Sequence, residues 1–217
     1  MIPCAMLRMD APSIVQARRS ASRAPQADMA LSEVFPESGA EAAAIGFVLT
    51  RLGSGAAPVL WIQDRLAQRE TGHPFLAGLG LQRPLMVMQL SRPADVMTAV
   101  EEGLRCRALA AVIAEVRGNP AAISFTATKR LALRVETSSV PCWLIRQAAA
   151  ADLSAASDRW RIATRPSAPN PDDPRAPGDP RWRVELFRSR DKRPGEWVAR
   201  HERGTADRVD LVAAVPD

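Results

Sequence analysis

The chain has 217 residues, of which 47% are hydrophobic, and 29 lysines and arginines against 24 acidic residues give a formal charge of +5. This length suits one domain with a single hydrophobic core. The net positive charge is smaller than that of a typical nucleic-acid-binding protein. Its three cysteines form no C-x-x-C pair, which argues against a disulfide framework and a zinc site. We therefore expect a cytoplasmic protein without a membrane-spanning segment, a secretory signal or a bound metal.

The first part of the chain predicts an arm, a strand and a helix. Residues 1–29 mix prolines, small residues and scattered arginines without a sustained period, which predicts a flexible N-terminal arm. Leu31 to Phe35 are typical of a short strand, and Pro36 to Gly39 of a turn. Ala42 to Leu52 predict a helix that is buried on more than one side.

The middle of the chain alternates strands with helices. Four apolar runs are too short and too continuous for amphipathic helices, and they predict buried parallel strands: Val59 to Ile62, Leu85 to Leu90, Ala108 to Val116 and Val140 to Ile145. One helix is expected from Pro93 to Arg105 and another after the capping residue Ser124. Because parallel strands need such crossovers, we expect a three-layer α/β sandwich with a mainly parallel central sheet over residues 30–164.

The last part of the chain differs from the middle in composition and in its pattern of hydrophobic residues. Residues 165–180 contain so many prolines that regular structure is excluded, which predicts a linker or exposed loop. On both sides of it, hydrophobic and charged residues alternate, first around Trp160 and Ile162 and then through residues 181–217. This alternation predicts half-buried antiparallel strands, with residues 181–217 as a C-terminal β-hairpin extension at the edge of the main sheet.

The turn after the first predicted strand stands where a phosphate-binding loop would be. In such loops glycines expose backbone N–H groups, a lysine neutralises the terminal phosphate, and a serine or threonine holds magnesium. The segment reads Phe35, Pro36, Glu37, Ser38, Gly39, Ala40, Glu41, Ala42. It resembles the loop of RecA at its proline, first glutamate and serine, but Glu41 replaces the lysine and Ala42 the threonine.

Phe35 and Ala40 replace two glycines of the RecA loop, and Gly39 replaces its second serine. An ordinary turn before a helix would also account for these residues. A glutamate in the lysine position repels a triphosphate, so we expect a degenerate loop with no bound cofactor and no catalytic residue.

Further segments extend the resemblance over about residues 30 to 215. The most specific ones are Glu101-Glu102-Gly103-Leu104-Arg105 and Arg181-Trp182-Arg183-Val184-Glu185-Leu186, and Arg193-Pro194-Gly195-Glu196-Trp197 adds to them. With the degenerate loop, they resemble the ImuA family. That resemblance implies a RecA-like fold and a non-catalytic accessory role in SOS-induced translesion synthesis and mutagenesis. The partners it implies are an ImuB-like homologue of the Y-family polymerases, indirectly an error-prone replicative-type DNA polymerase, and RecA as a further candidate.

Two residues bear on ATPase chemistry. The resemblance places Glu115 near the aspartate that supports the magnesium water shell in RecA-like proteins, and Arg65 near the catalytic glutamate. An ordinary polar residue at the end of a strand is the simpler interpretation of Glu115. Neither residue is expected to restore ATPase activity.

The C-terminal region supplies the candidate contact residues, in which basic side chains are interleaved with tryptophans: Arg181, Trp182, Arg183, Arg188, Arg190, Lys192, Arg193 and Trp197. Such mixing suits stacking on single-stranded bases, an edge hairpin with inward tryptophans, or a protein docking surface. The inward hairpin is the simplest interpretation, and the resemblance favours docking over DNA binding. The alternative function is a module that binds single-stranded DNA or modulates a RecA filament.

Overall fold

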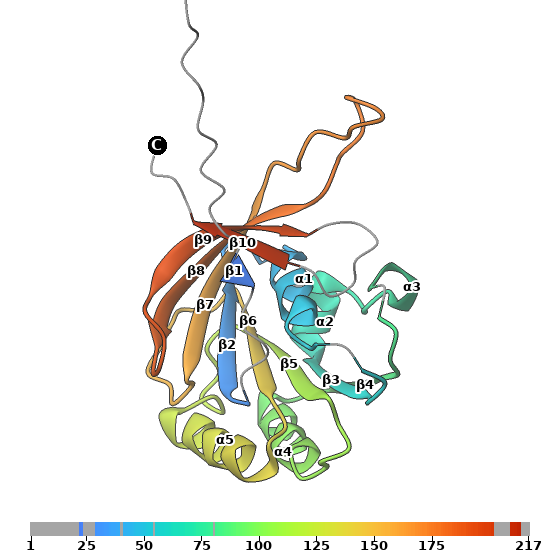
Figure 1. Ribbon diagram of the computed structural model, residues 1–217. Coiled ribbons are helices and arrows are strands. Elements are labelled where there is room, and N and C mark those ends of the chain that lie inside the picture. Colours follow the sequence, from blue (N-terminus) through green and yellow to red (C-terminus); the bar gives the residue numbers. More distant parts are fainter. Residues whose placement is uncertain are drawn as a thin grey trace, which may run out of the picture.

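The computed structural model describes residues 22–23, 29–39, 41–53, 55–79, 81–201 and 209–213. Its centre is a ten-stranded sheet with the order β1-β10-β9-β8-β7-β2-β6-β5-β3-β4 (Figure 1). From β7 to β4 the strands run parallel, and from β7 to β1 they pair antiparallel. The strands are β1 Ser22–Arg23, β2 Leu31–Pro36, β3 Val59–Asp64, β4 Leu85–Leu90, β5 Ala111–Arg117, β6 Cys142–Gln147, β7 Asp158–Arg165, β8 Arg181–Ser189, β9 Gly195–His201 and β10 Val209–Ala213.

Helices cover both faces of the parallel part of the sheet (Figure 1). They are α1 Ala43–Thr50, α2 Arg65–Thr71, α3 Leu76–Leu79, α4 Pro93–Gly103 and α5 Phe125–Ser138. One hydrophobic cluster joins α1 to the sheet, and a second joins α4 and α5 to the opposite face. The chain is thus an α/β protein with a mostly parallel sheet and added antiparallel strands, an arrangement consistent with a Rossmann- or RecA-like sandwich.

The strands of the parallel part are apolar on both faces because both faces are covered. In β3, for example, the ring of Trp61 lies in the cluster beneath α1, whereas the next residue, Ile62, lies in the cluster beneath α4 and α5. The three longer helices expected from the sequence are confirmed, and so are three of the four buried parallel strands, as β3, β5 and β6. The fourth, β4, is parallel as expected but not buried: it lies at the edge of the sheet, so Met86, Val87 and Met88 are exposed. Within the described residues, no helix is both long and apolar enough to cross a lipid bilayer.

Three further elements differ from the sequence-based expectation. The short helices α2 and α3 were not predicted. β7 was expected to be a half-buried antiparallel strand, but it pairs parallel with β2 on one side and antiparallel with β8 on the other. Since β7 lies inside the sheet, its residues Asp158, Arg159 and Trp160 are all buried.

The strands after the proline-rich segment continue the same sheet. β8 pairs with β7, and Trp182 and Val184 of β8 share the α1-side cluster with Trp160 and Ile162 of β7. Residues 166–180 connect these strands as a long excursion away from the body of the protein (Figure 1), closed by a bridge between Pro169 and Pro177. Of the predicted N-terminal arm, Ser22 and Arg23 form β1 against β10, and most of the rest lies outside the described residues.

Candidate functional site

The segment between β2 and α1 folds as a turn whose backbone donors bond within the protein. The N–H of Glu37 donates to the carbonyl of Ile162 at 2.9 Å, and the N–H of Glu41 donates to the carbonyl of Ser38 at 3.3 Å. Ala42, at the start of α1, supplies no side-chain cap. In a phosphate-binding loop such N–H groups face the ligand instead. Ala40 lies outside the described residues.

Side chains of both charges surround this turn. One carboxylate oxygen of Glu41 is buried and has no hydrogen-bond partner. A Cβ atom added to Gly39 would lie 3.4 Å from Nη1 of Arg117, so the Arg117 guanidinium rests against the turn. The same guanidinium lies 3.9 Å from Glu70, and the Arg117 N–H donates to Asp64 at 2.9 Å. Sequence analysis did not identify Arg117.

Glu115 lies within β5, which continues to Arg117, and its carboxylate is fully buried on the α1 side of the sheet. It accepts a hydrogen bond from Nε1 of Trp61 at 2.5 Å and another from Oγ1 of Thr71 at 3.5 Å. Burial raises the pKa of Glu115, and the bond from Trp61 opposes that rise. Glu115 is therefore an internal polar residue and not the end of a strand. Arg65 is exposed at the first position of α2.

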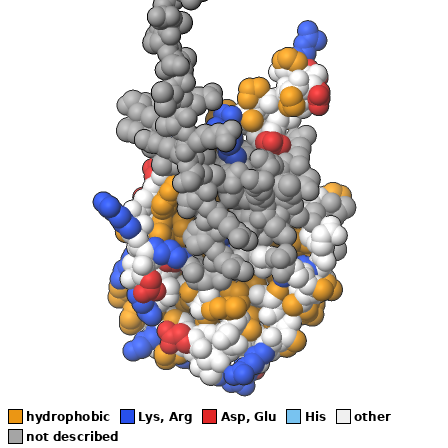
Figure 2. All heavy atoms as spheres, viewed as in Figure 1, with side chains coloured by type: hydrophobic (Ala, Val, Ile, Leu, Met, Phe, Trp, Pro, Cys, Tyr) orange, Lys and Arg blue, Asp and Glu red, His pale blue; other side chains and the backbone are white. Residues whose placement is uncertain are grey.

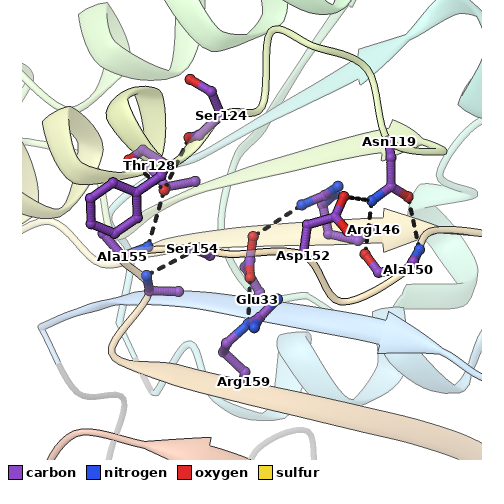
Figure 3. A network of polar contacts seen from close by, with 12 residues as sticks. Glu33, Asn119, Ser124, Thr128, Arg146, Ala150, Asp152, Ser154, Ala155 and Arg159 are labelled. Carbon is purple, nitrogen blue, oxygen red and sulfur yellow. Dashed lines mark hydrogen bonds and ion pairs between the residues drawn. The ribbon is translucent and has the colours of Figure 1, made fainter.

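A buried ion cluster crosses β2, β6 and β7 on the opposite face (Figure 3). Glu33 accepts from Nη1 of Arg146 at 3.1 Å and from Nε of Arg159 at 2.8 Å. All three side chains are almost completely buried. In the sequence, the only sign of this cluster is that charged residues such as Glu33 stand inside otherwise apolar strands. No sequence pattern shows that the three residues pair with one another.

Aromatic rings extend this cluster toward the surface of β8. Phe35 and Phe187 meet edge to face with their centroids 5.8 Å apart. The guanidinium of Arg159 lies over both rings, 5.2 Å from each centroid, and that of Arg161 lies 4.2 Å from the centroid of Phe187. We call these five residues, Glu33, Phe35, Arg159, Arg161 and Phe187, the arginine–aromatic row.

Two ion pairs border the exposed end of the arginine–aromatic row. Arg161 pairs with Glu185 at 3.2 Å, and Arg183 pairs with Glu37 of the β2–α1 turn at 3.0 Å. The side chains of Arg161 and Arg183 remain 47% and 25% exposed. The β2–α1 turn and the start of β8, which sequence analysis treated as separate candidates, are therefore joined by Arg183.

The other predicted contact residues are scattered along β8 and beyond it. Arg181 is half-buried at the start of β8, and Arg188 is exposed near its end, which is about 20 Å away for an extended strand. Arg190 pairs with Glu136 and Lys192 with Asp158, whereas Arg193 is exposed in the following turn. Basic and acidic side chains alternate along this margin of the molecule (Figure 2), so these residues do not form one basic patch.

The two tryptophans among the candidate contact residues, Trp182 and Trp197, pack into the hydrophobic core. Trp182 is 7% exposed, and a Cβ atom added to Gly46 of α1 would lie 2.7 Å from its ring. Trp197 is half-buried against the same cluster. The inward packing expected for the simplest hairpin interpretation is confirmed, and the ring of Trp182 has no free face on which a base could stack.

No protein-family model matches the sequence. Protein ImuA of Caulobacter vibrioides strain NA1000 / CB15N is 34% identical to the chain over 151 residues, which cover 64% of this chain. Protein ImuA of the second strain, CB 15, matches to the same extent. This similarity supports membership of the chain in the ImuA family, the family predicted from the sequence. The match spans only 59% of these relatives' length.

Two groups of charged side chains therefore lie near each other in this protein. The β2–α1 turn is lined by the carboxylates of Glu37 and Glu41 and by the Arg117 guanidinium. The exposed end of the arginine–aromatic row presents the Arg161 guanidinium, which is oriented by Phe187 and Glu185. Among the described residues, no cluster of acidic, histidine or cysteine side chains could hold a metal ion.

Proposed function

We propose that this ImuA-family chain is a non-catalytic accessory protein in DNA-damage-induced mutagenesis, where it supports translesion synthesis by binding an ImuB-like homologue of the Y-family polymerases. The match to Protein ImuA supports the assignment to this system. An error-prone replicative-type polymerase is reached indirectly through the ImuB-like protein, and RecA is a further candidate partner in the cytoplasm. The sandwich is, in this proposal, a RecA-like core whose phosphate-binding loop has degenerated.

The β2–α1 turn carries the non-catalytic part of the proposal. Glu41 stands in the place of the phosphate-binding lysine, and one of its carboxylate oxygens is buried without a partner. Two unit charges of like sign about 4 Å apart repel by about 4 kcal/mol at an effective dielectric constant near 20. A triphosphate bound there would meet this repulsion without the lysine of the RecA loop. The nearby cation, the Arg117 guanidinium, already lies 3.9 Å from the carboxylate of Glu70. These charges support the absence of ATP binding.

The exposed end of the arginine–aromatic row is the surface that we propose for the partner. Arginine is enriched among residues that dominate binding energy at protein interfaces, because its guanidinium stacks and bonds carboxylates in a fixed geometry. Arg161 is already oriented by Phe187 and Glu185, so little side-chain freedom is lost when a partner binds. The proposed surface comprises Arg161, Arg183 and Glu185 on β7 and β8.

The test is the affinity of the purified full chain for an ImuB-like protein. Arg161→Glu combined with Arg183→Glu should weaken binding by about tenfold or more, since charged interface groups are replaced by repelling ones. Arg105→Glu, on exposed Arg105 after α4, is the matched control and should leave the affinity unchanged. Equal affinity of the double variant and the control would show that the interface lies elsewhere. If the unaltered chain did not bind the ImuB-like protein at all, the proposed adaptor role would be wrong.

Surface variants test this proposal better than a truncation before Pro166. Removal of β8 and the following strands would uncover Trp160 and Ile162, which share a hydrophobic cluster with Trp182 and Val184. The loss of binding by such a fragment would report unfolding as readily as a lost interface. The turn itself is probed directly by the double variant Glu41→Lys with Ala42→Thr. Its ATP binding is compared with that of the unaltered chain.

Binding of single-stranded DNA is the second candidate function. Arg188 near the end of β8 and Arg193 in the following turn are both exposed, and arginines of this kind contact phosphate backbones. The buried ring of Trp182 and the interspersed carboxylates argue against it. Failure to shift oligonucleotides even at low ionic strength, where phosphate contacts are strongest, would remove this function.

A further inference from the structure

One edge of the sheet is formed by an apolar strand that the described chain leaves unpaired on its outer side. β4 pairs with β3 along all six of its residues, in parallel register and without a bulge. Met86, Val87 and Met88 are 45%, 44% and 40% exposed. Successive side chains point to opposite faces of a strand, so this apolar surface wraps around the edge on both sides.

The β4 edge lacks the usual protection against strand pairing. Natural edge strands are very short, carry an inward or central lysine or proline, or contain a bulge. The opposite edge of this sheet follows that rule, because β1 has only two residues. β4 has the sequence LMVMQL and none of these devices, and its outer N–H and C=O groups form a template for one more strand.

Arginines stand at both ends of the β4 edge. The Gln89 side chain of β4 donates a hydrogen bond to the Gln68 side chain of α2. Arg65 stands three residues before Gln68 and four before Arg69, so it lies one helical turn from each, and both arginines are exposed. Arg83 precedes the other end of β4 and donates to the carbonyl of Gly53. A strand that binds here is therefore favoured by carboxylates at its ends.

We infer that the β4 edge binds an extended segment of a partner protein, apolar in its middle and acidic at its ends, by β-strand addition. Main-chain hydrogen bonds supply affinity in this mode, and alternate side chains supply specificity. A second copy of the chain fits poorly, because an antiparallel pair of β4 strands places Arg83 of one copy near Arg65 and Arg69 of the other. The inference extends the proposed adaptor role by a second surface.

The test uses a fluorescent synthetic peptide of alternating valine and threonine with glutamates at both ends, titrated into the full chain. Met88→Lys should weaken its binding by about tenfold, since a charge replaces an apolar contact at the centre of the edge. Leu133→Lys is the matched control, because Leu133 is 53% exposed on α5. Amides of β4 should gain hydrogen-exchange protection when the peptide binds.

Charge reversal checks the chemistry of the partner. The same peptide with lysine ends should bind the unaltered chain more weakly than the glutamate peptide. Arg65→Glu with Arg69→Glu should remove most of that preference, since Arg83 alone then remains to favour a carboxylate. Equal binding by Met88→Lys and Leu133→Lys would overturn the inference. So would a dimer of the unaltered chain, seen by sedimentation, that Met88→Lys dissociates. Neither readout uses an ImuB-like protein, so a failure here is distinct from a failure of the proposed function.

Discussion

Glu33 is the residue on which the buried polar structure of the sheet depends most. Its carboxylate lies between the guanidinium groups of Arg146 and Arg159, and none of the three reaches solvent. Glu33→Gln removes the charge and leaves two buried cations. We expect a loss of about 3–5 kcal/mol in the free energy of unfolding, measured by urea denaturation, because breaking a buried ion pair leaves uncompensated charge.

The control for this change is Glu185→Gln, which breaks the exposed pair with Arg161. It should cost at most about 1 kcal/mol, since exposed ion pairs are screened by solvent. Similar losses for the two variants would show that Glu33 is not the buried anion of the cluster.

The raised pKa of Glu115 predicts the direction in which the free energy of unfolding changes with pH. Its pKa in the folded protein is raised by burial above the value of about 4.3 for an unfolded glutamate. The folded state thus holds the proton more tightly, and its contribution to stability is lost as the pH rises from about 4.3 through the raised pKa. Glu115→Gln keeps an acceptor for Trp61 but does not titrate, so its stability relative to the unaltered chain should increase with pH across this window.

Chemical denaturation at a series of pH values from 4 upward measures this difference. Parallel loss of stability in both proteins with rising pH would contradict the proposed titration of Glu115. A pH-dependent gain confined to the variant would support it.

These residues mark the limit of what the sequence could predict. Glu33 lies 113 positions from Arg146 and 126 from Arg159, and local periodicity carries no information on such distant pairs. The charged residues inside apolar strands were visible, but their partners were not. Arg117, which rests against the β2–α1 turn, was missed for the same reason.

At the scale of elements, α1 and β8 are joined by one close approach. Gly46 of α1 faces the Trp182 ring, and a Cβ atom there would come within 2.7 Å of it. Gly46→Ala should therefore destabilise the protein by about 1–3 kcal/mol through overpacking, measured as the shift of the urea midpoint. The matched change, Gly39→Ala, meets its nearest neighbour at 3.4 Å and should cost less. Equal effects would contradict the packing of β8 on α1.

The predictability of each element follows from its burial. β3, β5 and β6 were identified because they are apolar on both faces, and α5 because Ser124 caps it and its apolar stripe is long. α2 was missed because it is seven residues long and buries little beyond Ala67. Its one signal was Asp64, whose carboxylate accepts from the N–H of Ala67 as an N-cap.

At the scale of the whole molecule, the sequence predicted an α/β sandwich with antiparallel strands at its C-terminal end, and the structure confirms that architecture. The order of the strands could not be deduced from the apolar runs, because crossover connections allow several orders. β7 shows the consequence: its alternating pattern indicated a half-buried antiparallel strand, but it pairs parallel with β2, and Asp158 and Arg159 are buried there.

The proposed function requires a molecule that binds its partner without nucleotide. The continuous sheet from β4 to β1 holds the β2–α1 turn and the arginine–aromatic row in one body, linked by the pair between Arg183 and Glu37. A protein built in this way has its partner surface formed before any ligand arrives. Its affinity for an ImuB-like protein should accordingly be independent of ATP.

The most direct measurement is calorimetric titration of an ImuB-like protein into the full chain, with and without ATP and magnesium. The account predicts the same dissociation constant in both conditions and no heat of binding from ATP alone. A dissociation constant lowered by ATP, or no complex in either condition, would contradict it.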